Sequence, residues 1–348
     1  MRITLENNIS SRNLGTVLSA VWEFSCDPDC VVLKNENGKT VVEIPDNGLT
    51  CDTGVFLKIK GVESVDGIES KFQIVSSITR TGNGENITAN EIDIPGIDVT
   101  FGGNNFVVMA GPCAVEDEAT LLETAKEIKR VGISILRGGA FKPRTSPYSF
   151  QGLGSEGLRL LARVKAEIGI GIITEAMEPG MVDEVAEVAD IIQVGSRNMH
   201  SSPLLKAVGK CGKPVLLKRG MSATLEEWLG AAEYILSEGN PNVILCERGI
   251  RTFSRHSRHT LDLGVIPSLK ERCALPVIVD PSHATGSSAR VPSMARAALA
   301  AGADGLLLEI HPEPSKALSD GFQALNFKEF EKLMDELRSI SVIMGKTI

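Results

Sequence analysis

The sequence predicts an α/β protein, a (β/α)8 TIM barrel preceded by a small α+β ferredoxin-like domain. From residue 105 onward, eight short apolar runs alternate with amphipathic helical patterns. The runs lack the polar–apolar alternation of half-exposed strands, as expected for parallel strands that are buried on both faces. Eight such units typically need ~250 residues, which matches the chain after residue 104. An open doubly wound sheet is the alternative, but no Gly-x-Gly-x-x-Gly turn follows an early strand.

The barrel elements follow one another in regular order. Strands are expected at Phe106–Met109, Ile133–Leu136, Ile170–Ile173, Ile191–Val194, Val215–Leu217, Val243–Leu245, Pro276–Val279 and Gly305–Leu308. Helices are expected at Glu118–Arg130, Leu158–Glu167, Thr224–Ser237, Val291–Ala301 and Phe327–Ser339. Thr224 and Glu227 have the spacing of a capping box, which supports the start of the third of these helices.

The first hundred residues show a β-α-β-β-α-β pattern, the element order of a ferredoxin-like module. Its elements are expected at Ile3–Leu5, Leu14–Phe24, Val31–Leu33, Val41–Ile44, Val55–Ile59 and Val62–Val65. Further on, Ile92–Ile94 and Asp98–Phe101 flank a Pro-Gly turn. We expect residues 1–70 to form the ferredoxin-like domain, 71–104 a linker and a β-hairpin at the barrel bottom, and 105–348 the barrel.

Composition limits the classes of function. A net charge of −8 argues against nonspecific binding of nucleic acid. No apolar run approaches the ~20 residues of a membrane span, and the first residues lack the apolar stretch of a signal peptide. The seven cysteines include no Cys-x-x-Cys pair, so neither a disulfide framework nor a zinc ribbon is expected. These features predict a soluble, cytoplasmic protein.

Ionisable residues follow every predicted barrel strand. The carboxyl ends of all strands in a TIM barrel face one mouth, where active sites lie, so the pattern predicts an enzyme. One phosphate rarely needs six cations, which favours two phosphorylated substrates, one of them also a carboxylate. The six cations are Arg137, Lys142, Arg144, Arg197, Lys218 and Arg248. Arg219 should point away from the mouth and be structural.

Four further residues are candidate ligands of a divalent metal: Cys113, His283, Glu309 and Asp320. One sulfur, one imidazole and two carboxylates suit Mn, Fe, Co or Zn better than Mg or Ca. Their separation in the sequence keeps simpler interpretations open: Cys113 as a packed apolar residue, His283 as a core histidine, and the two carboxylates as solvated groups. Lys218 also suits a Schiff base, as in barrel aldolases.

Long motifs run from about residue 105 to the end: Ala110-Gly-Pro-Cys113, Leu136-Arg-Gly-Gly-Ala-Phe-Lys-Pro-Arg-Thr-Ser146, Gly195-Ser-Arg-Asn198, Leu217-Lys-Arg-Gly220, Cys246-Glu-Arg-Gly-Ile-Arg-Thr-Phe253, Val279-Asp-Pro-Ser-His283, Glu309-Ile-His-Pro-Glu-Pro314 and Ala317-Leu-Ser-Asp320. They resemble the motifs of DAHP synthases, 3-deoxy-D-arabino-heptulosonate 7-phosphate synthases of the short type. The N-terminal module is similar, with weaker sequence support, to a regulatory domain of some members.

The resemblance implies condensation of phosphoenolpyruvate with erythrose 4-phosphate and water, which gives the seven-carbon sugar phosphate and releases phosphate at the start of the shikimate pathway. It implies one divalent metal per subunit, held by Cys113, His283, Glu309 and Asp320. The implied phosphoenolpyruvate clamp is Arg137, Lys142, Arg197, Lys218 and Arg248. The implied erythrose 4-phosphate cradle is Lys142, Pro143, Arg144 and Thr145, with Ser146 and Asp320 also counted as substrate-binding.

Catalytic roles are expected for Lys142, Cys113, His283 and Glu175. Lys142 is placed to protonate the new alkoxide, and Glu175 to orient the attacking water. The resemblance also implies a homotetramer, with a homodimer as the alternative, and an N-terminal domain that binds an inhibitory aromatic amino acid or serves only in assembly.

Two rival activities remain. A 3-deoxy-D-manno-octulosonate 8-phosphate synthase uses the same barrel and chemistry with arabinose 5-phosphate, but its loop usually reads Lys-Ala-Asn-Arg-Ser where this chain has Lys142-Pro-Arg-Thr-Ser146. A class I aldolase with Lys218 as the Schiff-base lysine would need neither Cys113 nor so many cations.

Overall fold

The structure, a computed structural model, describes residues 1–7, 9–24, 31–36, 38–44, 56–66, 74–75, 91–143, 146 and 148–348. The chain forms two compact units, Met1–Ser76 and Ser77–Ile348. The expected boundary at residue 70 lies outside the described residues, as do residues 76–90 of the expected linker, so the division into domains stays a prediction.

The first unit contains a four-stranded antiparallel sheet with the order β2-β3-β1-β4. Its elements are β1 (Arg2–Leu5), α1 (Ser11–Phe24), β2 (Val32–Glu36), β3 (Lys39–Glu43) and β4 (Val62–Asp66). Ile3, Leu5 and Val42 from the sheet pack with Val17 and Val21 from α1 in one apolar core. This strand order is that of a ferredoxin-like module. Val55, where the second helix was expected to begin, lies outside the described residues.

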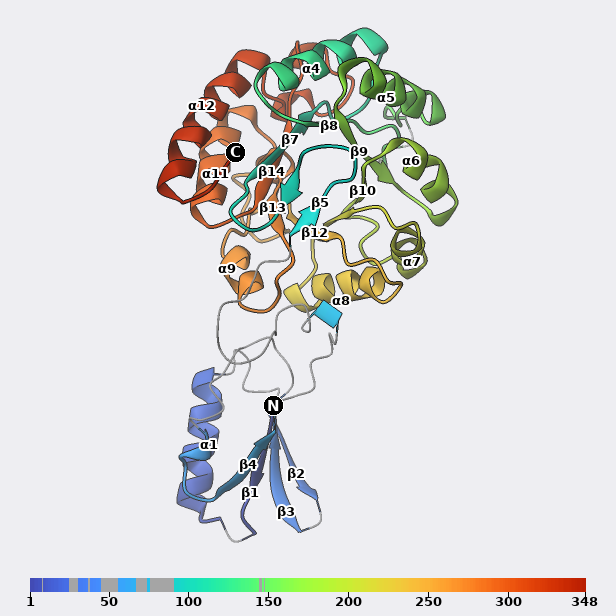
Figure 1. The fold of residues 1–348 in the computed structure, drawn as a ribbon. Coiled ribbons are helices and arrows are strands. Elements are labelled where there is room, and N and C mark those ends of the chain that lie inside the picture. The colour runs from blue at the N-terminus through green and yellow to red at the C-terminus, as the bar shows by residue number, and fades with distance from the viewer. Residues whose placement is uncertain are drawn as a thin grey trace. The chain divides into compact units, whose positions relative to one another are not determined.

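The second unit is a closed barrel of eight parallel strands, β7 to β14, surrounded by helices (Figure 1). The strands are β7 (Val107–Gly111), β8 (Ile135–Arg137), β9 (Gly171–Ala176), β10 (Ile191–Val194), β11 (Val215–Lys218), β12 (Val243–Glu247), β13 (Val277–Val279) and β14 (Gly305–Glu309). The helices are α4 (Glu118–Arg130), α5 (Ser155–Ile168), α6 (Val182–Val188), α7 (Ser202–Lys210), α8 (Leu225–Leu236), α9 (Val265–Lys270), α10 (Pro281–Thr285), α11 (Val291–Ala300) and α12 (Phe327–Ile343). The TIM barrel predicted from the sequence is confirmed.

Several strand ends differ from the prediction. In β8, β9, β11, β12 and β14 the observed strand includes a charged residue that was expected to follow it, whereas the ends of β7 and β13 shift without a charged residue. Lys218, Glu247 and Glu309 are the last residues of β11, β12 and β14, whereas they were expected to follow those strands. Glu175 lies within β9, two residues beyond the expected end of that strand. β8 begins two residues later than expected and includes Arg137. These side chains are buried at the mouth, and those of Lys218, Glu247 and Glu309 contact buried groups of opposite charge. Their backbone can therefore stay paired with the neighbouring strand, as Glu309 of β14 does with Gly111 of β7.

A short hairpin fills one end of the barrel. It consists of β5 (Ile92–Asp93) and β6 (Thr100–Phe101), and its Ile92, Ile94 and Phe101 pack among inward-facing strand residues that include Ile135 and Ile191. Those two residues begin their strands, so the hairpin closes the amino end. The active site is therefore expected at the carboxyl end of the barrel strands. No helix among the described residues has the length and apolar character needed to cross a membrane.

Candidate active site and metal centre

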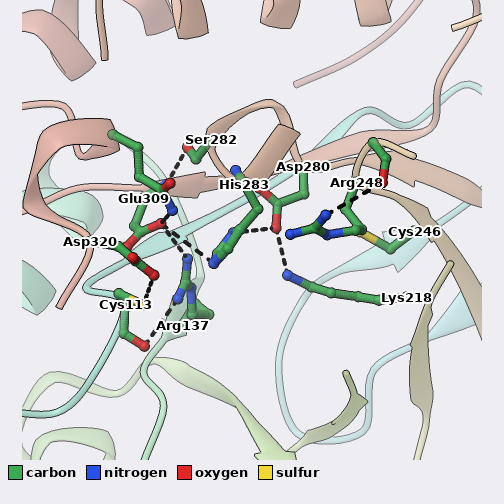
Figure 2. Close-up of polar contacts among 12 residues, drawn as sticks. Cys113, Arg137, Lys218, Cys246, Arg248, Asp280, Ser282, His283, Glu309 and Asp320 are labelled. Carbon is green, nitrogen blue, oxygen red and sulfur yellow. Dashed lines mark hydrogen bonds and ion pairs between the residues drawn. The ribbon is translucent and has the colours of Figure 1, made fainter. Parts of the chain in front are cut away.

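The four candidate metal ligands lie together at the carboxyl end of the barrel. Cys113 follows β7, His283 lies in α10 after β13, Glu309 ends β14, and Asp320 lies in the following loop (Figure 2). One ligand atom from each residue can be chosen so that all four lie within 4.8 Å of one another. The Sγ of Cys113 is 3.3 Å from Oδ2 of Asp320, and Nε2 of His283 is 3.6 Å from Oε2 of Glu309.

This cluster fits a divalent cation. Glu309 is fully buried, and its Oε1 has no hydrogen-bond partner among the described residues. Burial lowers the pKa of His283 to about 4, so the imidazole is neutral, the form that binds metal. Burial and the Glu309 charge raise the pKa of the Cys113 thiol, although Lys142 and Arg137 oppose them. A bound cation would compensate the buried carboxylate and favour the thiolate.

Two residues that the sequence did not single out hold the carboxylate ligands. Gln323 is fully buried; its Nε2 donates to Oε2 of Glu309, and its Oε1 accepts from Nη1 of Arg258 at 3.0 Å. The same Arg258 nitrogen lies 3.8 Å from Oδ1 of Asp320. Asp320 has a φ of 53°, the one left-handed non-glycine backbone in the part of the chain that the structure describes. Such conformations persist only where the surroundings enforce them.

Asp280 links the metal cluster to the cations. It is fully buried, and its Oδ2 lies 2.5 Å from Nζ of Lys218 and 2.7 Å from Nδ1 of His283. Burial alone would raise the pKa of Asp280, but His283, Lys218 and Arg137 outweigh it and hold that pKa well below its usual range. Its Oδ1 accepts from the backbone N–H of His283 at 3.0 Å and so caps α10.

The predicted cations converge on one pocket beside this cluster. Five of them line it, Arg137, Lys142, Arg197, Lys218 and Arg248, and Arg258 is a sixth that the sequence did not indicate. Nε and Nη2 of Arg137 are buried without a hydrogen-bond partner among the described residues. Burial lowers the pKa of Arg248. Buried cations with unused donors are costly unless an anion binds them, so the pocket is built for anionic ligands.

Two glycines bring functional groups close to this pocket. A Cβ at Gly195 would meet Oε1 of Glu175 at 2.1 Å, so glycine lets the carboxylate lie over the backbone after β10. Glu175 lines the pocket, and its Oε2 accepts from Nε2 of Gln193 at 2.9 Å. A Cβ at Gly139 would meet the carbonyl oxygen of Cys113 at 2.7 Å. Nζ of Lys142 donates to that same oxygen, also at 2.7 Å.

The predicted erythrose 4-phosphate cradle is only partly described. Pro143 lines the pocket, whereas Ser146 is exposed and not among the lining residues, its Oγ accepting from the backbone N–H of Tyr148. Arg144 and Thr145 lie outside the described residues.

Arg219 points away from the pocket, as predicted. Its Nη1 lies 3.0 Å from Oε2 of Glu247 and 2.9 Å from Oδ2 of Asp262, and its Nε donates to the carbonyl of Ala223 at 3.1 Å. The guanidinium also lies 5.8 Å from the ring centroid of buried Trp228. We call Arg219, Glu247 and Asp262 the shell network, because they hold β11, β12 and the loop after β12 together behind the pocket.

Comparisons with known proteins show the family to which the chain belongs. The family model described as the DAHP synthetase I family matches residues 77–344. The chain is 45% identical over 283 residues to phospho-2-dehydro-3-deoxyheptonate aldolase of Thermotoga maritima, which covers 81% of this chain and 83% of that protein. It is 34% identical over 270 residues to 2-dehydro-3-deoxyphosphooctonate aldolase of Syntrophotalea carbinolica, covering 72% of this chain and 96% of that protein.

The crystal structure of the Thermotoga maritima DAHP synthase superposes with a TM-score of 0.78 at 39% identity, covering 99% of this chain and 98% of that one. A truncated form of the same enzyme gives a TM-score of 0.70 at 45% identity over 74% of this chain and 94% of that one. The chain therefore belongs to the DAHP synthetase I family, which confirms the resemblance seen in its motifs.

Proposed function

We propose that the protein condenses phosphoenolpyruvate with erythrose 4-phosphate and water to give 3-deoxy-D-arabino-heptulosonate 7-phosphate and phosphate, the first step of the shikimate pathway. The observation that carries the proposal is the shared mouth: six cations line one pocket, and His283 and Asp320 of the four-residue cluster line it too. A small trianion and an aldehyde can therefore be held side by side. Family membership and the Thermotoga maritima relative support the same reaction.

Arg137, Lys218 and Arg248 are the proposed centre of the phosphoenolpyruvate clamp. All three are buried and line the pocket. Arg137 has spare donors, and Lys218 can exchange its contact with Asp280 for a phosphate or carboxylate oxygen. Lys142 and Arg197 complete the clamp. Fixed cations on several sides hold the substrate in one orientation, which is worth more to catalysis than affinity alone.

Cys113, His283, Glu309 and Asp320 are proposed to hold one divalent ion, Mn, Fe, Co or Zn. When bound, that ion supplies a Lewis acid for the aldehyde oxygen of the sugar phosphate. Pro143, with Arg144, Thr145 and Ser146, is proposed to receive the sugar phosphate.

We assign the bond changes to these side chains. The methylene carbon of phosphoenolpyruvate attacks the aldehyde carbon, and the new alkoxide takes a proton, for which Lys142 is the proposed donor. Water adds to the former enol carbon and gives one proton back to Lys142, the bond between that carbon and the bridging phosphate oxygen breaks as the ketone forms, and phosphate leaves with the other proton. Glu175 is the proposed group that orients this water, because its Oε1 is buried without a hydrogen-bond partner among the described residues.

The first test follows loss of phosphoenolpyruvate with erythrose 4-phosphate or arabinose 5-phosphate, each with Mn²⁺ and with chelator. We expect loss only with the four-carbon sugar and metal. Loss of phosphoenolpyruvate with arabinose 5-phosphate would instead indicate a 3-deoxy-D-manno-octulosonate 8-phosphate synthase. The relative from Syntrophotalea carbinolica is named as a 2-dehydro-3-deoxyphosphooctonate aldolase. Trapping of a substrate adduct on Lys218 by borohydride would instead support a class I aldolase.

The remaining parts of the proposal concern the whole protein. We place the enzyme in the cytoplasm as a homotetramer or homodimer, and we assign residues 1–70 as the binding unit for an inhibitory aromatic amino acid. Removal of residues 1–75 should abolish inhibition by tyrosine or phenylalanine while turnover remains. Retained inhibition would exclude a sensor role for that unit.

A further inference from the structure

A single carboxylate oxygen serves both halves of the active site. Oδ2 of Asp280 contacts Nζ of Lys218 at 2.5 Å and Nδ1 of His283 at 2.7 Å, and Figure 2 shows the Asp280 carboxylate joined by dashed lines to both side chains. The other oxygen, Oδ1, is occupied by the backbone N–H of His283. Asp280 and Lys218 are almost completely buried, so water cannot replace either contact freely.

The contact with Asp280 decides which nitrogen of His283 can bind a metal. Nδ1 makes no hydrogen bond of standard geometry with the described residues, but the carboxylate 2.7 Å away repels a lone pair there, so the neutral imidazole carries its hydrogen on Nδ1. The lone pair is then on Nε2, which lies 3.6 Å from Oε2 of Glu309 and so faces the ligand cluster. A carboxylate behind a ligating histidine fixes the tautomer and raises the basicity of the ligating nitrogen.

Lys218 competes for the same oxygen. While its ammonium is bound to Oδ2, less of the negative charge on Asp280 is available to the imidazole. Lys218 also lines the anion pocket, so a bound phosphoenolpyruvate would draw the ammonium toward the substrate. Asp280 would then act on His283 alone, and Nε2 would become a stronger ligand.

We propose that Asp280 is a positioning residue that couples substrate binding at Lys218 to metal binding at His283. This inference rests on the proposed function, because it takes phosphoenolpyruvate as the anion and the four-residue cluster as the metal site. Coupling between binding sites is reciprocal, so phosphoenolpyruvate should tighten the metal and the metal should tighten phosphoenolpyruvate by the same factor.

The test measures Mn²⁺ affinity of the full chain, from the electron paramagnetic resonance signal of free Mn²⁺, with and without saturating phosphoenolpyruvate. Erythrose 4-phosphate is left out, so no turnover occurs. In the wild type we expect phosphoenolpyruvate to lower the dissociation constant of Mn²⁺ by roughly fivefold or more. Asp280→Asn should raise that constant by roughly 10- to 100-fold without substrate, and phosphoenolpyruvate should then change it less than about twofold.

Two further variants separate this device from simple charge attraction. Lys218→Met frees Oδ2, so its Mn²⁺ affinity without substrate should approach that of the wild type with substrate. Arg248→Met is the matched control: it removes a buried pocket cation whose one described hydrogen bond is to the carbonyl of Gly249 rather than to Asp280. Its Mn²⁺ affinity should stay within about twofold of the wild type, and saturating phosphoenolpyruvate should still tighten the metal.

The binding measurements separate failure of the Asp280 coupling from failure of the proposed function. Wild-type protein that binds neither Mn²⁺ nor phosphoenolpyruvate would overturn both. Wild-type protein that binds both without coupling, or Asp280→Asn with undiminished coupling, would overturn only the inference. Asparagine can still cap α10, which favours a folded variant. If it does not fold, Lys218→Met carries the test, and an unchanged Mn²⁺ affinity in that variant would contradict the proposal.

Discussion

Two pairs of neighbouring residues at the barrel mouth differ in the side of the barrel wall that they face, either the pocket or the shell network behind it. Lys218 and Arg248 line the pocket, while Arg219 and Glu247, each next to one of them in the chain, bond to each other behind it. Arg219 has three acceptors around it, in Glu247, Asp262 and Ala223. For Arg248 the described residues supply one long hydrogen bond, 3.4 Å to the carbonyl of Gly249.

The difference lies in how far the protein satisfies its own charges. The buried charges of the shell network are paired with each other, so a ligand would stabilise them little. The unused donors of the pocket can still form hydrogen bonds to an anion, so anion binding is favourable there. Loss of a shell charge should therefore lower stability, and loss of a pocket charge should lower catalysis.

The largest effect is expected from loss of a metal ligand on the pocket side. Cys113→Ala should lower kcat by roughly 10³-fold or more, because a bound metal contributes several kcal/mol to the transition state and each ~1.4 kcal/mol is a factor of ten. The control is Cys211→Ala, a half-exposed cysteine whose Sγ donates to the carbonyl of Val208. Steady-state kinetics with added Mn²⁺ would contradict the assignment if both variants kept full turnover.

Glu247→Gln tests the shell side. It leaves Arg219 buried without its fully buried carboxylate partner, so the free energy of unfolding should fall by about 3 kcal/mol, whereas KM for phosphoenolpyruvate in the folded enzyme should change little. Urea unfolding followed by circular dichroism, together with KM measurement, checks both parts. A large rise in KM with unchanged unfolding would erase the distinction between the two sides.

Gln323→Met should have a smaller effect than either of these changes. The change keeps a similar volume but removes the hydrogen bonds to Glu309 and Arg258, which orient the carboxylate ligands. Mn²⁺ affinity should fall by roughly 10-fold or more, as for other groups that support metal ligands. A Mn²⁺ titration of the purified variant provides the measurement. An unchanged dissociation constant would show that the ligands need no such support.

Thr224→Ala should have the smallest effect and act only on the shell side. Thr224 and Glu227 form the predicted capping box at the start of α8, whose Trp228 packs behind Arg219. Loss of a cap typically costs ~1 kcal/mol of stability. Thermal unfolding should show this loss while kcat and KM stay at wild-type values. A changed KM would mean that the helix start reaches the pocket.

The parts that the sequence predicted best depend on local or repeated signals. The bounds of α4 agree with the expected helix Glu118–Arg130, because a cap at Asp117 and an apolar stripe mark it locally. The eight apolar runs located all eight strands because each is buried on both faces. Cys113, His283, Glu309 and Asp320 were found through their motifs, and the structure brings them together.

The residues that were missed depend on contacts between distant segments. Arg258 and Gln323 lie 65 positions apart and follow no spacing rule, and a surface loop with arginine looks the same in sequence whether or not it folds over a pocket. Asp280 was visible in Asp280-Pro-Ser-His283, but its contact with Lys218 spans 62 positions. The contrast between Lys218 and Arg219 could be predicted, because successive side chains along a strand point to opposite sides.

Arg248→Met and Arg219→Met each remove one buried arginine from neighbouring strand ends. For each we would measure KM for phosphoenolpyruvate with erythrose 4-phosphate and Mn²⁺, and the thermal unfolding midpoint of the same sample.

Arg248→Met should raise KM by roughly 10- to 100-fold, the loss of charged hydrogen bonds to an anion, with an unchanged or higher midpoint. Arg219→Met should lower the midpoint by roughly 6 °C or more, with KM near the wild-type value. A lower midpoint for Arg248→Met together with a higher KM for Arg219→Met would contradict the account.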